Sequence, residues 1–145
     1  MSILISNQQE EVKLNLSRIK REINKILKSL ACSNSEISIL FTSDEHIKNL
    51  NKTYRKKNRP TDVLAFSQNE GDSPGINTNI LGDVVVSTDT AKRQADERSH
   101  SVEKEIFILL IHGILHLLGF DHEKEKKDLK KMQSKEKELL TLIKC

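Results

Sequence analysis

The sequence predicts an α+β fold in which one sheet packs on helices within a single compact domain, residues 1–145. Three observations support this fold class. The chain has the usual length of one domain, and its 36% hydrophobic and 31% charged residues are the balance of a soluble globular protein. Segments with strand and helix periodicity follow one another in the order βαβαββααα, a mixture typical of layered α+β architectures. Because aromatic residues make up only 3%, we expect a core of Ile, Leu and Val.

The first half of the chain predicts two strands, each followed by a helix. Residues 2–5 form a short apolar strand, and residues 8–31 carry apolar side chains at helical spacing. Residues 36–42 alternate between apolar and less apolar side chains, as a half-buried strand does. Ser43 then has the character of an N-cap, with acidic residues in the turn after it, and begins a helix that ends near residue 54.

The second half predicts two strands followed by three helices. The strands cover residues 63–67 and 80–87, and the segment between them is a loop rich in Gly and Asn. The helices cover residues 88–98, 102–118 and 123–143. The middle helix is apolar nearly all round, which indicates a buried central helix.

The two cysteines and the N-terminus bear on the compartment. Cys32 and Cys145 lie far apart and neither has a partner at metal-ligand spacing, so we expect free thiols in a reducing environment. The N-terminus lacks the pattern of a signal peptide, and no apolar run reaches the length of a membrane span. We therefore expect a cytoplasmic protein without a membrane partner.

A basic segment, residues 52–59 (KTYRKKNR), contains five cations and no acidic residue. The net charge of +3 is too balanced to indicate a nucleic-acid partner by itself. A segment of this kind is usually a solvated surface loop, and binding of a polyanion is the alternative. The candidate contacts to phosphate in that alternative are Lys52, Lys56, Lys57 and Arg59.

The C-terminal end of the central helix holds three of the five histidines within eleven residues, HGILHLLGFDH. His112 and His116 are four residues apart, so their imidazoles lie one turn apart on one helix face. Gly119 allows the chain to turn back, and this reversal can bring His122 round as a third ligand. Three protein ligands that leave one position open are the pattern of a catalytic zinc site.

The same spacing occurs in the metzincin signature HExxHxxGxxH, with one difference. The glutamate that serves as general base in those proteases is replaced here by Gly113. The pattern therefore predicts the metal ligands without the base of a protease. We expect a glutamate restored at position 113 to crowd the site and to face the substrate.

Two acidic residues near the histidines have two interpretations each. Asp121 precedes the expected third ligand, and it either orients a ligating imidazole or begins the last helix. Glu105 lies seven residues before His112 on a similar helix face, and it either supports the site or is simply a helix-start glutamate.

Three segments carry a family resemblance: LNKTYRKKNRPTDVLAF at 50–66, LGDVVVS at 81–87 and HGILHLLGFDH at 112–122. Together they resemble the YbeY family of bacterial metal-dependent endoribonucleases. The last segment is highly specific for the family, and the occurrence of all three segments in this order is more specific still. The first 45 residues match the family only in the order of their elements.

The resemblance implies a compact domain with a small, mostly parallel four-stranded sheet packed on helices. It also implies a zincin-like three-histidine metal site on the central buried helix, with His112, His116 and His122 as ligands. The implied cofactor is one Zn²⁺ per chain, with another divalent transition metal as the alternative. Ala65 and Phe120 differ from the residues common in the family, and neither is an expected ligand.

The function implied by the resemblance is single-strand-specific RNA cleavage in ribosomal RNA maturation, at the 3′ end of 16S RNA, and in ribosome quality control. The implied partners are ribosomal RNA and the small ribosomal subunit with its assembly factors. No DNA partner is expected. The functional arginine of the family corresponds to Arg55.

The chemistry of these residues suits a phosphodiester substrate. Three neutral imidazoles leave the charge of a divalent ion uncompensated, which favours an anionic substrate and lowers the pKa of bound water. A guanidinium such as that of Arg55 can stabilise the charge that develops on phosphate oxygens, and a surface arginine is the alternative interpretation. Candidates for the general base are Asp62, Asp83 and Asp121. Asp62 would also suit a turn cap, and Asp83 a polar position at a strand end.

Two other functions stay open on the sequence alone. A zincin-type peptidase or amidase is disfavoured by the missing glutamate at position 113. A non-catalytic ribosome-assembly factor with a structural metal is disfavoured by the open coordination position.

Overall fold

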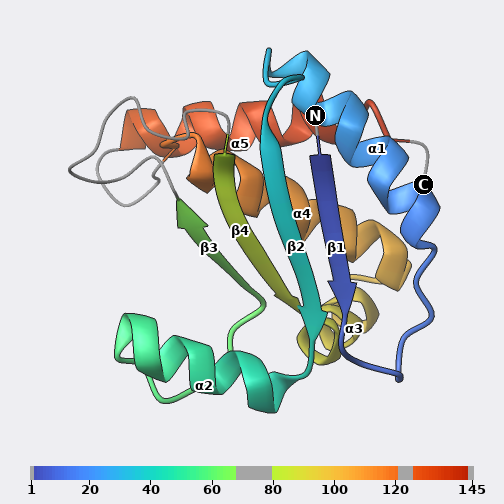
Figure 1. Ribbon diagram of the computed structural model, residues 1–145, viewed down its shortest axis with the longest axis vertical. Coiled ribbons are helices and arrows are strands. Elements are labelled where there is room, and N and C mark those ends of the chain that lie inside the picture. The colour runs from blue at the N-terminus through green and yellow to red at the C-terminus, as the bar shows by residue number, and fades with distance from the viewer. Residues whose placement is uncertain (1, 68–79, 121–125, 144–145) are drawn as a thin grey trace.

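The computed structural model describes residues 2–67, 80–120 and 126–143. Within these ranges a four-stranded sheet packs on five helices, in the order expected from the sequence (Figure 1). No helix in them is long and apolar enough to cross a membrane. The strands are β1 (Ser2–Asn7), β2 (Glu36–Thr42), β3 (Val63–Ser67) and β4 (Ile80–Ser87). The helices are α1 (Leu16–Ser29), α2 (Asp44–Arg55), α3 (Thr88–Glu97), α4 (Val102–Leu117) and α5 (Lys126–Leu140).

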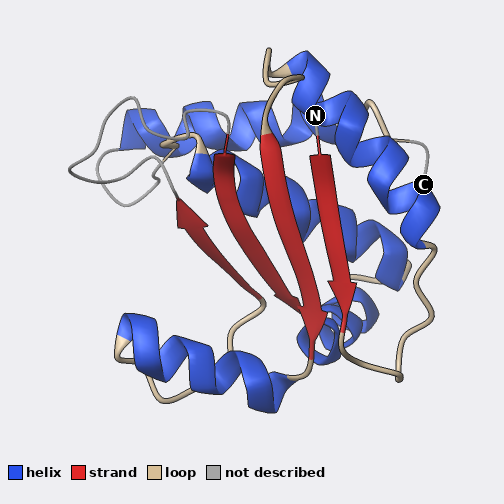
Figure 2. Cartoon of the chain, viewed as in Figure 1, coloured by secondary structure: helices blue, strands red, loops and turns tan. Residues whose placement is uncertain are grey.

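The sheet has the strand order β1-β2-β4-β3 (Figure 2). β1 pairs with β2 and β2 pairs with β4 in parallel, whereas β3 runs antiparallel to β4. The expected small, mostly parallel sheet is therefore confirmed. β3 is an edge strand, and its register places Ala65 opposite Val84.

The two faces of the sheet are covered unequally. On one face α1 and α4 pack against alternate strand residues, such as Ile39 and Val84, to form the main core. On the other face α2 contributes Ile47 to a small cluster with Leu64 and Val85. Figure 1 looks onto this second face, which the described helices leave open over β1 and β2. The central helix α4 thus belongs to the covered side.

Helix α1 begins at Leu16, so the expectation of a helix from residue 8 is wrong at its start. The Gln9 side chain accepts a hydrogen bond from Val12 N–H and donates one to Val12 O, both at 2.9 Å. Asn15 then caps the helix, with its Oδ1 accepting from Arg18 N–H at 3.1 Å. These side chain–backbone bonds offer the segment an alternative to helical bonding. The helical spacing of apolar residues extends to positions before Leu16 because Val12 is buried although it lies outside the helix.

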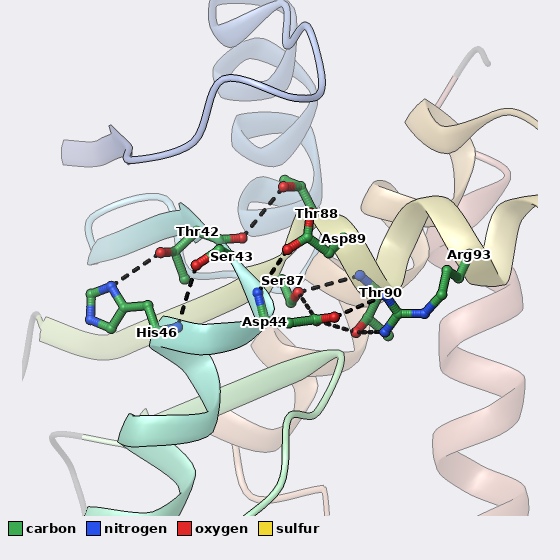
Figure 3. Close-up of polar contacts among 9 residues, drawn as sticks. All are labelled: Thr42, Ser43, Asp44, His46, Ser87, Thr88, Asp89, Thr90 and Arg93. Carbon is green, nitrogen blue, oxygen red and sulfur yellow. Dashed lines mark hydrogen bonds and ion pairs between the residues drawn. The ribbon is translucent and has the colours of Figure 1, made fainter.

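The first turns of α2 and α3 are joined by an exchange of carboxylates (Figure 3). The Asp44 carboxylate in α2 accepts from Ser87 Oγ and Thr90 Oγ1, each at 2.6 Å, and pairs with Arg93 at 2.8 Å. In return, Asp89 of α3 accepts from the Asp44 backbone N–H at 2.9 Å. Each carboxylate lies near the positive end of a helix dipole. The exchange therefore fixes the orientation of α2 relative to α3.

The same contacts change the acidity of Asp44. Partial burial raises the pKa of this carboxyl, but the hydrogen bonds from Ser87, Thr90 and Arg93 and the charge of Arg93 lower it more. The net pKa lies below the ordinary aspartate value of 3.8. The contacts thus favour the ionised form, and they stabilise the fold while Asp44 is ionised.

We predict that Asp44→Asn lowers the free energy of unfolding near neutral pH by about 1–2 kcal/mol, because it removes a charge from this set of hydrogen bonds. A depressed folded pKa gives stability that is present above the unfolded value and lost as pH falls through the folded value. The difference between wild type and variant should therefore shrink as pH falls below 3.8. Urea unfolding at a series of pH values measures it, with Asp96→Asn at an exposed site of α3 as the matched control. A difference that is constant with pH would contradict this role of Asp44.

Candidate active site

The last two turns of α4 bring His112 and His116 together. Their ring centroids are 4.6 Å apart with an interplanar angle of 70°, and their Nε2 atoms are 3.0 Å apart. Both side chains are partly exposed. Two Nε2 atoms at about 2.0–2.1 Å from one tetrahedral ion would lie roughly 3.3 Å apart. The separation found here fits two ligands of a single metal ion after a small adjustment.

Glu136 of α5 orients the first of these imidazoles. Its Oε1 lies 2.8 Å from His112 Nδ1. Because an ionised carboxylate only accepts, Nδ1 carries the proton and donates, which leaves Nε2 of a neutral His112 as the lone-pair nitrogen. That nitrogen is the one directed at His116. A carboxylate on the far nitrogen of a ligating histidine is the usual arrangement in metal sites.

Glu136 is not among the residues predicted from the sequence, although its position carries a signal. Met132, Leu139 and Ile143 are buried and lie on the inward face of the last helix. Glu136 occupies the same helical phase, one turn after Met132. A glutamate at an inward position of an amphipathic helix indicates a partner inside the fold.

Gly119 ends the histidine-bearing helix as the sequence predicts. It has a φ of 93°, and its N–H donates to His116 O at 3.0 Å. Phe120 N–H donates to Leu115 O, also at 3.0 Å. This pair of bonds around a left-handed glycine is the Schellman motif, and it redirects the chain just after the second histidine.

His122 and Asp121, the expected third ligand and its neighbour, lie outside the described residues. Among the residues that the structure does describe, no three His, Cys, Asp or Glu side chains are grouped as a metal site requires. The described part of the site therefore contains two converging imidazoles and the carboxylate that orients one of them.

Gly113 does not face the substrate side, so that expectation is wrong. A Cβ at this position would lie 2.8 Å from Val84 Cγ1 and 3.4 Å from Val63 Cγ2. The residue packs against the sheet. A glutamate here would require the Val84 side chain or α4 to shift.

Arg55 is the last residue of α2 and does not lie in a loop. Its guanidinium lies over the Phe66 ring, with Cζ 5.4 Å from the centroid. Its Nη2 donates to the Ala65 carbonyl oxygen at 2.7 Å. Both contacts are with the edge strand β3.

The guanidinium and the histidine-bearing turn of α4 lie at the same level of the sheet. Ala65, which accepts from Arg55, is opposite Val84 in the β3–β4 register. Gly113, which follows His112, packs on that same Val84. Arg55 and the histidine-bearing turn of α4 therefore both lie beside the β3–β4 pair.

Two of the candidate bases have other surroundings. Asp62 accepts from Val63 N–H at 2.8 Å and from Gln94 Nε2 at 3.3 Å, which is the turn-cap arrangement. Asp83 lines a groove on the sheet face opposite α4, because its neighbour Val84 faces α4. The structure does not bring either carboxylate to the histidine pair.

Glu105 also has a different partner set. It is fully buried and accepts from Arg98 Nη1 at 2.7 Å, and its Oε1 lies 2.6 Å from His100 Nε2. A buried carboxylate needs such partners to compensate for lost hydration. Glu105 thus joins the α3–α4 connection, two turns before the histidines.

The basic segment 52–59 is exposed throughout. The buried Asn51 fixes the segment through hydrogen bonds to its backbone. Asn51 O accepts the backbone N–H of Lys57 at 3.2 Å, and its Nδ2 donates to Arg59 O at 2.9 Å. The four candidate phosphate contacts, Lys52, Lys56, Lys57 and Arg59, thus lie beside Arg55 on an ordered turn.

The chain matches a known protein family over nearly its full length. A family model described as endoribonuclease YbeY matches residues 4–144. The chain belongs to this family. Because the match begins at residue 4, it includes the N-terminal part, where the sequence motifs gave no support.

Curated members of the YbeY family agree over nearly the full length. The endoribonuclease YbeY of Syntrophus aciditrophicus is 43% identical over 144 residues, which are 99% of this chain and 90% of that protein. The endoribonuclease YbeY of Aquifex aeolicus is 46% identical over 131 residues, which are 90% of this chain and 85% of that protein.

A solved structure has the same fold. The solution structure of a Thermotoga maritima protein superposes with a TM-score of 0.69 at 32% sequence identity, and the match covers 97% of this chain and 87% of that one. The resemblance inferred from the three sequence segments is therefore confirmed at the level of family and fold.

We predict that Gly113→Ala lowers the free energy of unfolding by about 1–2 kcal/mol, because overpacking against the stiff Val84 side chain outweighs the helix propensity of alanine. Urea unfolding of Gly113→Ala, Val84→Ala and the double variant measures this effect. In the Val84→Ala background the new methyl group has room, so the same substitution should cost less. Stabilisation by Gly113→Ala in the wild-type background would show that α4 does not approach the sheet as closely as described.

Proposed function

We infer that this chain is a metal-dependent endoribonuclease that acts in ribosomal RNA processing, as its membership of the endoribonuclease YbeY family implies. The observation that carries this inference within the chain is the pair of converging Nε2 atoms, one of which is oriented by Glu136. Such a pair is suited to a metal and, with a guanidinium nearby, to a phosphodiester substrate.

The metal ligands in this proposal are His112, His116 and His122. Neutral imidazoles suit zinc, and another divalent transition metal is the alternative. When bound, the ion would supply a water activated at neutral pH and a positive charge beside the substrate phosphate. Glu136 holds the first imidazole in the tautomer that a metal requires.

Arg55 has the transition-state role in this proposal. A guanidinium offers five N–H donors in a planar fork, and the bond to Ala65 O uses Nη2. The remaining donors can contact two phosphate oxygens at once. Packing on Phe66 and the bond to Ala65 limit the freedom of the side chain, so its charge is held in place before the substrate arrives.

The neighbouring cations and one acidic residue complete the assignment. Lys52, Lys56, Lys57 and Arg59 would bind the RNA backbone without distinguishing its sequence. Of the three candidate bases we retain only Asp121, because the other two have the surroundings described above. Asp121 either accepts the proton of the attacking water or orients a ligating imidazole.

The finer assignment follows the same family. We propose a single-stranded substrate near the 3′ end of 16S ribosomal RNA, a role in ribosome quality control, partners in the small ribosomal subunit and its assembly factors, and action in the cytoplasm. The peptidase alternative lacks support, because position 113 packs against Val84 and a glutamate base there would require Val84 or α4 to shift. The non-catalytic alternative lacks support as well, because the curated relatives are named endoribonucleases.

We predict close to one zinc-type ion per purified chain, and loss of metal and RNA cleavage together in His112→Ala and His116→Ala. Glu136→Gln should weaken metal binding by roughly 10–100-fold while the fold is kept, because it removes only the orienting carboxylate. Metal analysis and competition with a chelator measure both effects. Glu138→Gln is the matched control, because it lies on the same helix with an exposed side chain. Full metal occupancy in both histidine variants would exclude this ligand set.

We predict that Arg55→Ala slows single-turnover RNA cleavage by about a hundredfold or more, because it removes a donor that acts mainly in the transition state. Metal content should be unchanged. Arg55→Lys should recover only part of the rate, because an ammonium cannot make the two-pronged phosphate contact. Lys57→Ala, the control within the basic segment, should weaken RNA binding and its salt dependence modestly without a large change in rate. Cleavage by Arg55→Ala at the wild-type rate would reduce Arg55 to a part of the basic surface.

A further inference from the structure

The face of the sheet opposite α4 carries a groove that the histidine pair does not use. The groove has a volume of about 630 Å³, with β1, β2 and β4 as its floor and α2 along one side. Figure 1 looks onto this face, with α2 beside the lower ends of the strands. Leu4 on the floor has 54% of its surface exposed, so the described part of the chain does not fill the groove. A volume of this size suits a small organic group.

An exposed aromatic side chain lines the groove. Tyr54 of α2 has 64% of its surface exposed, although it is a large side chain with an apolar ring. It packs edge-on against Phe66 of β3, with ring centroids 5.3 Å apart and an interplanar angle of 65°. The Arg55 guanidinium lies over the same Phe66 ring. Phe66 therefore links Tyr54 in the groove lining to the proposed phosphate-binding group.

The groove floor combines apolar surface with hydrogen-bonding groups. Ser38 and Asp83 alternate with apolar residues on β2 and β4. His46 lines the groove from α2, with its Nδ1 3.1 Å from Thr42 Oγ1 (Figure 3). Nucleobase edges carry donors and acceptors that hydroxyl, imidazole and carboxylate groups can match, and a carboxylate accepts from an exocyclic amino group. The lining is mostly apolar with these polar groups set within it, and such a lining can take a flat ring with polar edges.

The groove lining includes the carboxylate of Asp83 and, among the described residues, no lysine or arginine. The cations that favour a polyanion as the molecule carrying this ring lie beside the groove, in the segment that holds Tyr54. Tyr54 belongs to the basic segment 52–59, which is exposed throughout and has five cations and no acid. Stacking on an aromatic side chain beside cations is the common mode of single-stranded nucleic-acid binding. Bases in a duplex are paired and stacked on each other, and only an unpaired base could enter the groove.

We propose that this groove binds an unpaired nucleobase of the RNA substrate, stacked on Tyr54, while the adjoining phosphate lies at Arg55. The proposal rests on the proposed function for its class of ligand. It assigns the open sheet face to substrate binding and gives a structural cause for preference for single strands. Tyr54 is a substrate-binding residue in this arrangement and has no part in the chemical step.

The chain provides its own probe for this proposal. Tyr54 is its only tyrosine and it has no tryptophan, so intrinsic tyrosine emission reports on this groove alone. A short single-stranded RNA with 2′-O-methyl groups, checked by gel electrophoresis to stay intact with the full chain, is titrated into it, and a duplex of the same sequence is titrated separately. We expect saturable quenching of the emission by the single strand and much weaker quenching by the duplex.

Affinity measured by anisotropy of the labelled single strand gives the second readout. Tyr54→Ala should weaken binding by roughly tenfold, the usual effect of losing one stacked base. Tyr54→Phe should bind like wild type, because it keeps the ring. Leu142→Ala, which removes an exposed apolar side chain outside the groove, should also bind like wild type.

The outcomes separate this proposal from the proposed function. Wild-type affinity in Tyr54→Ala, or unchanged tyrosine emission when anisotropy shows saturation, would overturn the groove assignment even if the wild type cleaves RNA. In that case the open face would be left for another partner, such as a protein. If the wild type neither binds the single strand nor cleaves unmodified RNA, the proposed function fails and the groove assignment fails with it.

Discussion

Helix α4 lies so close to the sheet that one added methyl group at residue 113 would come within 2.8 Å of Val84 Cγ1. This approach is the constraint on which the site depends. It fixes the height of α4 above β3 and β4, and so the positions of His112 and His116 on the same helix. It also means that the glutamate of a metzincin at position 113 would displace Val84 or α4. The same packing therefore positions the two described histidines and disfavours a glutamate between them.

The second half of the site is held by polar contacts instead of apolar packing. Asp44 and Asp89 exchange hydrogen bonds between the first turns of α2 and α3 and so set the direction of α2. At the other end of α2, Arg55 is held by Ala65 and Phe66 of β3. Buried apolar packing thus positions the histidines from one face of the sheet, and a partly exposed polar framework positions the cations from the other. Both meet at β3, which is the only antiparallel strand in the described sheet.

Much of this architecture could be predicted from local patterns. Periodicity and caps located all nine described elements, and the spacing of His112 and His116 predicted their proximity because it depends on one helix alone. What failed depended on contacts between elements. The start of α1 was misplaced because Gln9 and Val12 bond to each other, and Glu136 was missed because its partner lies on another helix. The side on which Asp83 lies was not predictable either, because the valines around it suit a strand buried on both faces.

The bond from Arg55 to Ala65 has a consequence beyond catalysis. An edge strand presents backbone groups that can pair with a strand of another molecule, and proteins commonly cover such edges with charged side chains. Arg55 covers the Ala65 carbonyl in the middle of β3 and places a cation there. It therefore guards the sheet against intermolecular strand addition. In a chain that lacks Arg55, the edge of β3 is open to pairing with other chains. The yield and colloidal behaviour of such a variant will change independently of its turnover.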